Sequence, residues 1–332
     1  MTASETTDLV ALGDIDELVR YTDRLTDAER WDDLVELRDL SRLALERGRQ
    51  LWPVAARAEY RLALDAPGQW AAKVLVSGTG RFALGPLPEV AASTHTWDDL
   101  ADHVIPGIPE AAIAAHERVV RGDDLRGDRR LDPFVLEVPL ALCPWEPSYP
   151  VAEYLADEAR FPLPEFGGFH YVASEIRARP AEDADAVRAL VELATAWTAD
   201  SNGHCEAVAV HGDAAAALDL LGLGPDGARM AEITPAAAMA WMAWTAASGG
   251  AHGRRRGMAA GRFAAWWAAA ALTGMLEDYP PDPSELGDAI SELRWWAWDP
   301  GGPEPGWACR LAIEDPADGL AWALNATDAA LP

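Results

Sequence analysis

Residues 239–267 read MAWMAWTAASGGAHGRRRGMAAGRFAAWW, a stretch in which two tryptophan-bearing apolar segments flank a loop rich in glycine and arginine. The apolar segments extend over Pro235–Ala247 and Phe263–Leu276. Each is long enough for a buried helix but shorter than the roughly 20 residues that a membrane-spanning helix needs. We therefore expect two core helices joined by a basic loop, residues 249–257, called the Gly-Arg loop below.

The sequence around this stretch predicts a mixed α/β region over residues 169–332. Glu206–Val210 and Met230–Ile233 are short apolar runs typical of strands, and the tail after Trp295 predicts two or three more, joined by Pro-Gly turns. Thr234-Pro235 and Asp282–Glu285 have the residues that begin helices, and Ala184–Ala199 is an apolar helical stretch. These patterns predict helices packed on a small sheet.

Residues 1–121 read as helices, and residues 122–168 as a connector rich in proline and glycine. Thr26–Glu29 has the pattern of a capping box, and apolar residues follow it at helical spacing from Trp31 onward. We expect helical hairpins packed side by side, then a domain boundary in the connector, where Phe134–Leu142 alternates like a strand. The predicted class is α+β and mostly helical.

The composition of the chain excludes some classes of binding partner. The formal net charge of -27 repels nucleic acid and anionic membranes, so neither is an expected partner. Three widely spaced cysteines do not form a disulfide framework, and the N-terminus lacks the features of a signal peptide, so we expect a cytoplasmic protein. His and Cys show no paired metal-ligand spacing, so we expect neither a metal nor a cofactor.

The Gly-Arg loop holds the candidate site. If the loop ends near Gly253, the arginines after it lie in the first turn of the next helix, whose free amides already attract anions. The balancing anion is either an external phosphate or carboxylate or one of the protein's own carboxylates, and internal pairing is expected for at least one arginine. Tryptophans nearby could stack on a sugar or a base, although core packing is their simpler role. The candidate ligand residues are His252, Arg254, Arg255, Arg256, Arg262, Trp244 and Trp266.

The same stretch resembles an uncharacterised family of actinobacterial proteins, a domain of unknown function. The resemblance rests on residues 241–267 and covers the C-terminal half at most. It implies no activity. Two hypotheses of function follow from the residues: a non-enzymatic interaction or regulatory protein with a protein partner, and alternatively an enzyme or sensor that binds a small anionic ligand at the Gly-Arg loop.

Overall fold

The computed structural model describes residues 5–131, 135–172, 178–222, 228–301 and 306–329. Two compact units share the chain. The helical unit comprises Met1–Val119, Leu125–Val135 and Ala152–Phe161, and the sheet unit comprises Val120–Asp124, Leu136–Val151 and Pro162–Pro332. Residues 122–168, expected to be a connector, therefore contribute to both units.

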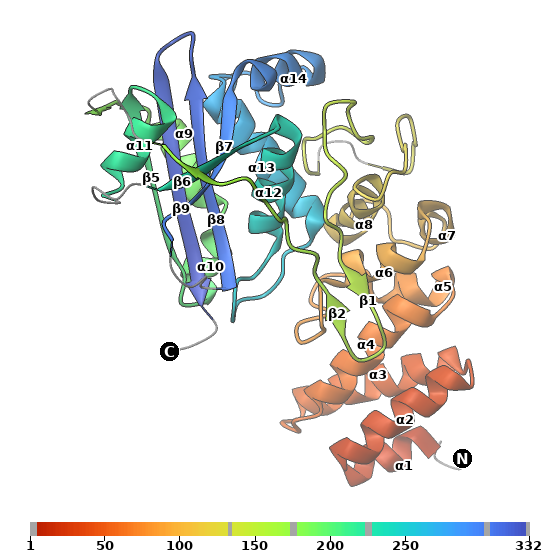
Figure 1. The fold of residues 1–332 in the computed structure, drawn as a ribbon. Coiled ribbons are helices and arrows are strands. Elements are labelled where there is room, and N and C mark those ends of the chain that lie inside the picture. The colour runs from red at the N-terminus through yellow and green to blue at the C-terminus, as the bar shows by residue number, and fades with distance from the viewer. Residues whose placement is uncertain (1–4, 132–134, 173–177, 223–227, 302–305, 330–332) are drawn as a thin grey trace. The chain divides into compact units, whose positions relative to one another are not determined.

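Helices dominate the helical unit, as the apolar spacing predicts (Figure 1). Leu18, Leu34 and Leu62 are fully buried where α2, α3 and α4 pack against one another. The elements of this unit are α1 (Glu5–Leu12), α2 (Ile15–Asp27), α3 (Trp31–Glu46), α4 (Trp52–Asp65), α5 (Gly68–Ala71), the 3-10 helix η1 (Ala72–Val74), α6 (Leu87–Thr94), α7 (Trp97–Ala101), α8 (Pro109–Val119), and the strand pair β1 (Glu153–Tyr154) and β2 (Ala159–Arg160).

The predicted capping box at Thr26 is wrong. Thr26 lies in the last turn of α2, where its hydroxyl donates to the Thr22 carbonyl at 3.0 Å. Glu29 has a φ of 53°, and α3 begins at Trp31, where the side chain of the preceding Arg30 forms no cap. Thr26 therefore belongs to α2, and the positive φ of Glu29 interrupts the helical backbone before α3 begins.

The sheet unit is built on a seven-stranded antiparallel sheet, larger than the small sheet expected, in the order β3-β6-β7-β8-β9-β5-β4. Of the described residues, 46% are helical and 15% lie in strands, so the fold is α+β and helices make up just under half of it. Its strands are β3 (His170–Tyr171), β4 (Arg179–Pro180), β5 (His204–His211), β6 (Arg229–Ile233), β7 (Arg294–Asp299), β8 (Gly306–Asp315) and β9 (Leu320–Ala329). Its helices are α9 (Ala184–Glu192), α10 (Thr195–Asp200), α11 (Ala214–Leu220), α12 (Pro235–Ala247), α13 (Met258–Leu272) and α14 (Pro283–Glu292).

Successive side chains of β7 point to opposite faces of this sheet. Trp295 and Ala297 pack in the core with α9, α12 and α13, whereas Trp296 and Trp298 pack with α11. Figure 1 shows the same arrangement, with α11 and the pair α12 and α13 on opposite sides of the strands. The tail is rich in tryptophan because both faces of its strands are covered.

Two strand predictions are not met. Residues 135–142 form no strand, and Phe134 lies outside the described residues. The alternating stretch Phe169–Arg177 yields the two-residue strand β3, and residues 173–177 lie outside the described part.

The predicted helix Ala184–Ala199 is divided into α9 and α10.

Candidate functional site

The Gly-Arg loop is irregular throughout, and α13 begins only at Met258. The expectation that Arg254–Arg256 lie in the first helical turn is therefore wrong. Gly257 has a φ of +96°, outside the helical region, and this delays the start of the helix. His252, Arg254 and Arg256 are exposed, and Arg255 is half-buried.

The glycines of the loop allow backbone segments of the protein itself to approach closely. A Cβ added to Gly249 would lie 2.3 Å from the Gly253 carbonyl oxygen, and one added to Gly250 would lie 2.2 Å from a carboxylate oxygen of Asp328. Neither position has room for a side chain. The glycine pattern is therefore explained by internal packing.

Four backbone amides of the loop are also engaged internally. Gly250 N donates to Ser248 Oγ (3.1 Å), Ala251 N to Asp328 Oδ2 (2.6 Å), His252 N to Ser201 Oγ (3.0 Å) and Arg256 N to the Ala247 carbonyl (2.7 Å). These four amides are therefore not available to an external anion.

Arg262 and Trp266 belong to a different place, a buried network centred on Glu146. The Arg262 guanidinium contacts the Glu146 carboxylate through two nitrogens, at 2.7 and 2.8 Å, and both side chains are essentially inaccessible. Trp266 Nε1 donates to the same carboxylate at 2.8 Å. The guanidinium also donates to the carbonyls of Pro139 and Ala141. Both predicted ligand residues are thus used to hold the sheet unit together.

The environment of Glu146 keeps it charged. Burial by itself would raise the pKa of this carboxyl, but the hydrogen bonds and charge of Arg262, with the Cys143 amide and Trp266, hold its pKa below the ordinary value. Sequence reasoning missed Glu146 because it lies 116 residues from Arg262 and no local pattern pairs the two.

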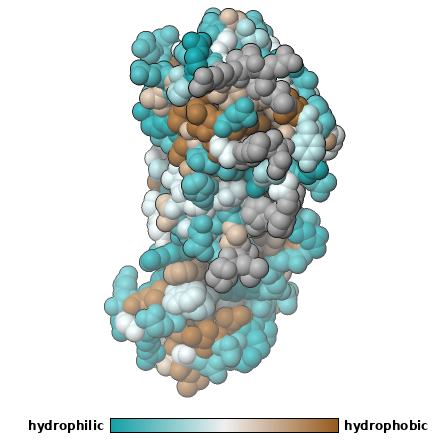
Figure 2. All heavy atoms as spheres, turned by 60° about the vertical axis from the view of Figure 1, so that its left-hand side comes forward, coloured by the Kyte–Doolittle hydropathy of each residue, from teal (hydrophilic) through white to brown (hydrophobic). Residues whose placement is uncertain are grey.

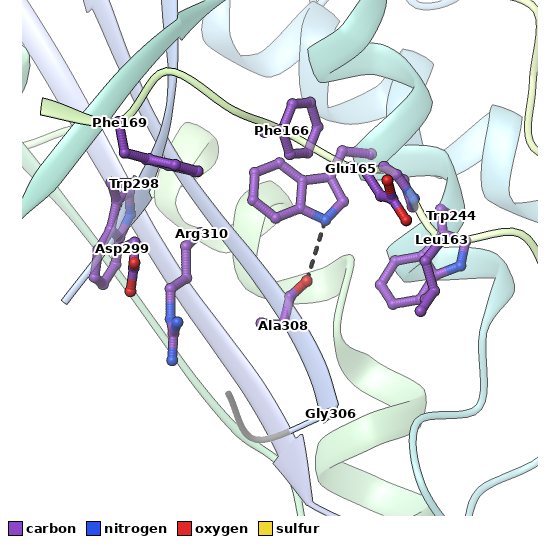
Figure 3. A pocket seen from close by; sticks show the side chains of 12 residues that line it. Leu163, Glu165, Phe166, Phe169, Trp244, Trp298, Asp299, Gly306, Ala308 and Arg310 are labelled. Atoms are coloured by element: carbon purple, nitrogen blue, oxygen red, sulfur yellow. Dashed lines mark hydrogen bonds between the residues drawn. The ribbon is translucent and has the colours of Figure 1, made fainter. Parts of the chain in front are cut away.

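A cleft of about 410 Å³ lies at one end of the sheet (Figure 3). Within it, aromatic side chains are combined with two acidic groups and one basic group. Its lining consists of Leu163, Pro164, Glu165, Phe166, Phe169, Trp241, Trp244, Trp298, Asp299, Gly306, Ala308 and Arg310.

Strand pairing explains why the cleft is open. The register of β7 with β8 extends from Arg294↔Glu314 to Ala297↔Leu311. Beyond it, Trp298 and Asp299 pair with β6, whereas β8 pairs with β9 as far as Gly306. Over the described residues the two central strands therefore separate here, and α12 and residues 163–169 supply the remaining walls.

The tryptophans of α12 are fixed in the cleft wall. Phe166 packs on Trp241 with ring centroids 4.4 Å apart, and the indole N–H of Trp241 donates to the Ala308 carbonyl at 3.1 Å (Figure 3). Trp244 stacks on Trp307 at 5.7 Å. The buried Nε1 of Trp244 has no hydrogen-bond partner among the described residues. This is unusual, because a buried indole N–H generally finds an acceptor.

Charged groups lie on both sides of Phe166 in the view of Figure 3, with Asp299 and Arg310 on the left and Glu165 on the right. Asp299 forms an ion pair with Arg229. The Arg310 guanidinium lies over the Trp298 ring, 5.6 Å from its centroid. The cleft thus offers acceptors and a donor beside apolar ring surface.

Sequence reasoning located this cleft only in part. Trp244, a predicted ligand residue, lines it, and Trp241 was visible three residues earlier on the same helical face. The other predicted residues do not line it in the described part of the chain. Phe166, Phe169 and Arg310 were missed, because nothing local shows that residues 163–169 and β8 meet α12.

Two other kinds of feature are absent from the part of the chain that the structure describes. No group of three or more His, Cys, Asp or Glu side chains is placed to hold a metal ion. No helix there has the length and apolar character needed to span a membrane.

The chain belongs to a family of unknown function, DUF6183, whose model matches residues 16–330. The match extends over nearly the whole chain, so the family relationship is not confined to the C-terminal half as the resemblance had indicated. No curated protein and no solved structure matches the chain.

Proposed function

We propose that this chain, whose family has no assigned activity, is a non-enzymatic binding protein. Its ligand is a small uncharged molecule with the chemistry of a sugar ring, an apolar face edged by hydroxyl groups, and it binds in the cleft between β7 and β8. The observation that carries the proposal is the combination of aromatic walls with both donors and acceptors in one cleft.

The size and walls of the cleft suit such a ligand. Its volume of about 410 Å³ lies within the usual range of small-molecule sites, roughly 300–1,000 Å³. Aromatic faces carry partial negative charge and attract the weakly positive C–H groups of a sugar ring. Such apolar surface comes from the rings of Trp241 on α12, Trp298 on β7 and Phe169 in the segment before β3.

The polar groups favour an uncharged ligand over an anion. Glu165 and Asp299 can accept hydrogen bonds from hydroxyl groups, and Arg310 can donate to them. Asp299 is paired with Arg229 and Glu165 lies in the same lining as Arg310, so the cleft has no excess of positive charge, and the net charge of -27 opposes a phosphate-bearing ligand.

A thermal-shift panel tests the proposal, with neutral monosaccharides and disaccharides, nucleosides, amino acids and inorganic phosphate at equal concentration. A sugar at 100 times its Kd should stabilise the protein by about 2.7 kcal/mol. The effect should disappear in Phe169→Ala and Arg310→Ala. It should persist in Tyr171→Ala, which changes an aromatic ring that is 73% exposed and does not line the cleft.

Other results would contradict the proposal in distinguishable ways. Stabilisation by phosphate alone, lost in Arg256→Ala, would support the alternative of an anion sensor at the Gly-Arg loop. Silence across the whole panel would remove the cleft as a sugar site. Turnover of a bound sugar would show that the protein is an enzyme.

A further inference from the structure

The helical unit contains a separate groove of about 450 Å³, on α3, α4 and the loop that follows η1. Its floor includes Ala55 and Ala56, two small buried residues of α4. We call it the Trp52–Phe82 groove. It is lined by Arg42, Leu45, Glu46, Gln50, Trp52, Ala55, Ala56, Glu59, Gly78, Arg81 and Phe82.

Two large aromatic side chains are exposed in this groove. Trp52 is 39% exposed and Phe82 is 51% exposed, and their ring centroids lie 4.3 Å apart. Figure 2 shows hydrophobic side chains gathered over the N-terminal helices at the bottom of the view, among hydrophilic ones. Exposed aromatic residues that are grouped together commonly mark protein-interaction sites, where Trp and Arg contribute most of the binding energy.

Hydrogen bonds hold the groove in its open shape. The nearly buried Glu59 carboxylate pairs with Arg42 at 2.5 Å and accepts from the Gly80 amide at 2.7 Å. Arg42 also donates to the Gly78 carbonyl at 3.1 Å. The loop that carries Arg81 and Phe82 is thereby tied to both α3 and α4. A partner would find this surface already formed, with little ordering cost on binding.

The charge of the groove differs from that of the whole chain. Acidic residues outnumber basic ones 54 to 27 overall. The lining of the groove, by contrast, has equal numbers of each sign: Arg42 pairs with the buried Glu59, and Arg81 lies beside the aromatic pair. The adjoining loop adds the exposed Arg47 and Arg49. Glu46 is the exposed acidic residue of the lining.

We propose that the Trp52–Phe82 groove binds an acidic peptide segment of a partner protein. An apolar side chain of the segment packs against Trp52 and Phe82 above the alanine floor. A carboxylate beside it pairs with Arg81, since Arg42 is already held by Glu59. This site is independent of the cleft in the sheet unit, so either proposal can fail without the other.

Fluorescence anisotropy with the full chain and two labelled synthetic peptides tests this site. The peptides have equal length and the same Leu and Phe positions, but one carries Glu at every other position and the other carries Lys. The Glu peptide should bind at least about tenfold more tightly, and its affinity should fall as NaCl is added. Equal binding of the two peptides, or no binding of the Glu peptide, would overturn the proposal.

Single substitutions test whether the Glu peptide binds in the Trp52–Phe82 groove. Trp52→Ala and Arg81→Ala should each weaken the Glu peptide by about tenfold. Phe82→Ala provides a second aromatic variant, and circular dichroism should show that all three remain folded. Leu12→Ala, which alters an 80% exposed apolar residue outside the groove, should leave affinity unchanged. Undiminished binding in folded Trp52→Ala and Phe82→Ala would place the peptide elsewhere and overturn the assignment.

Discussion

At the residue scale, arginines that are close in sequence have very different environments. Arg254 and Arg256 are exposed on the Gly-Arg loop, whereas Arg262, one turn into α13, is buried against Glu146. The difference comes from helix geometry, because α13 turns the Arg262 side chain toward the core while the loop leaves its neighbours at the surface. The expectation of internal pairing concerned Arg254–Arg256, whereas the buried pair in the structure is formed by Arg262.

Replacing Arg262 tests this difference. Arg262→Ala leaves the Glu146 carboxylate buried and without its cation, which should cost about 3–5 kcal/mol of unfolding free energy. Arg256→Ala is the matched control and should change stability by less than about 0.5 kcal/mol. Urea unfolding monitored by tryptophan fluorescence measures both. Equal losses in the two variants would contradict the account.

The ion pair also has a defined pH dependence. The pKa of Glu146 is lowered in the folded protein, so its stabilising contribution is complete above the pKa of an unfolded glutamate and is lost as pH falls through the folded value. The stability difference between wild type and Glu146→Gln should therefore be largest near neutral pH and shrink in acid. Urea unfolding of both proteins across this range measures the difference. A constant difference would show that the charge of Glu146 does not contribute.

At the element scale, α12 and α13 approach closely through Gly261. A Cβ on this residue would lie 2.1 Å from the Ala243 carbonyl oxygen and 2.9 Å from the Ala247 methyl group. The two tryptophan-bearing helices can pack at this separation only because one of them has glycine at the contact. This contact places Trp241 and Trp244 relative to the sheet.

Gly261→Ala should therefore force the helices apart and cost about 1–3 kcal/mol. Gly167→Ala is a suitable control, since a Cβ there would meet nothing within 4 Å. The melting temperatures of the two variants provide the measurement. If Gly261→Ala melted like the control, the close contact between α12 and α13 would be wrong.

Features that depend on residues close together in the sequence could be predicted, and those that depend on distant segments could not. Thr234 caps α12 and Asp282 caps α14, as their local patterns predict. The tail strands and β5 and β6 were also predictable, since short apolar runs and Pro-Gly turns are local signals. Glu146 and the order of the sheet were not, because both depend on pairs of segments distant in sequence. At the candidate site the same limit holds: Trp244 was found, and the aromatic residues from 163–169 were not.

At the scale of the whole molecule, the chain combines two compact units that each carry a distinct candidate binding surface. The sheet unit holds the aromatic cleft, and the helical unit holds the Trp52–Phe82 groove. The proposed ligands, a sugar ring and an acidic peptide segment, are different in chemistry. A protein that responds to a small molecule and also contacts a partner would fit the regulatory hypothesis drawn from the sequence.

The central claim is that the cleft binds a sugar-like ring, and ¹⁹F NMR of protein labelled with 5-fluorotryptophan tests it most directly. Single Trp→Phe variants assign the signals of the fifteen tryptophans. On titration with the sugar that gives the largest thermal shift, the signals of Trp241, Trp244 and Trp298 should move together and saturate, while that of Trp52 in the helical unit stays fixed. Saturating shifts confined to tryptophans outside the cleft, or no shifts at all, would contradict the account.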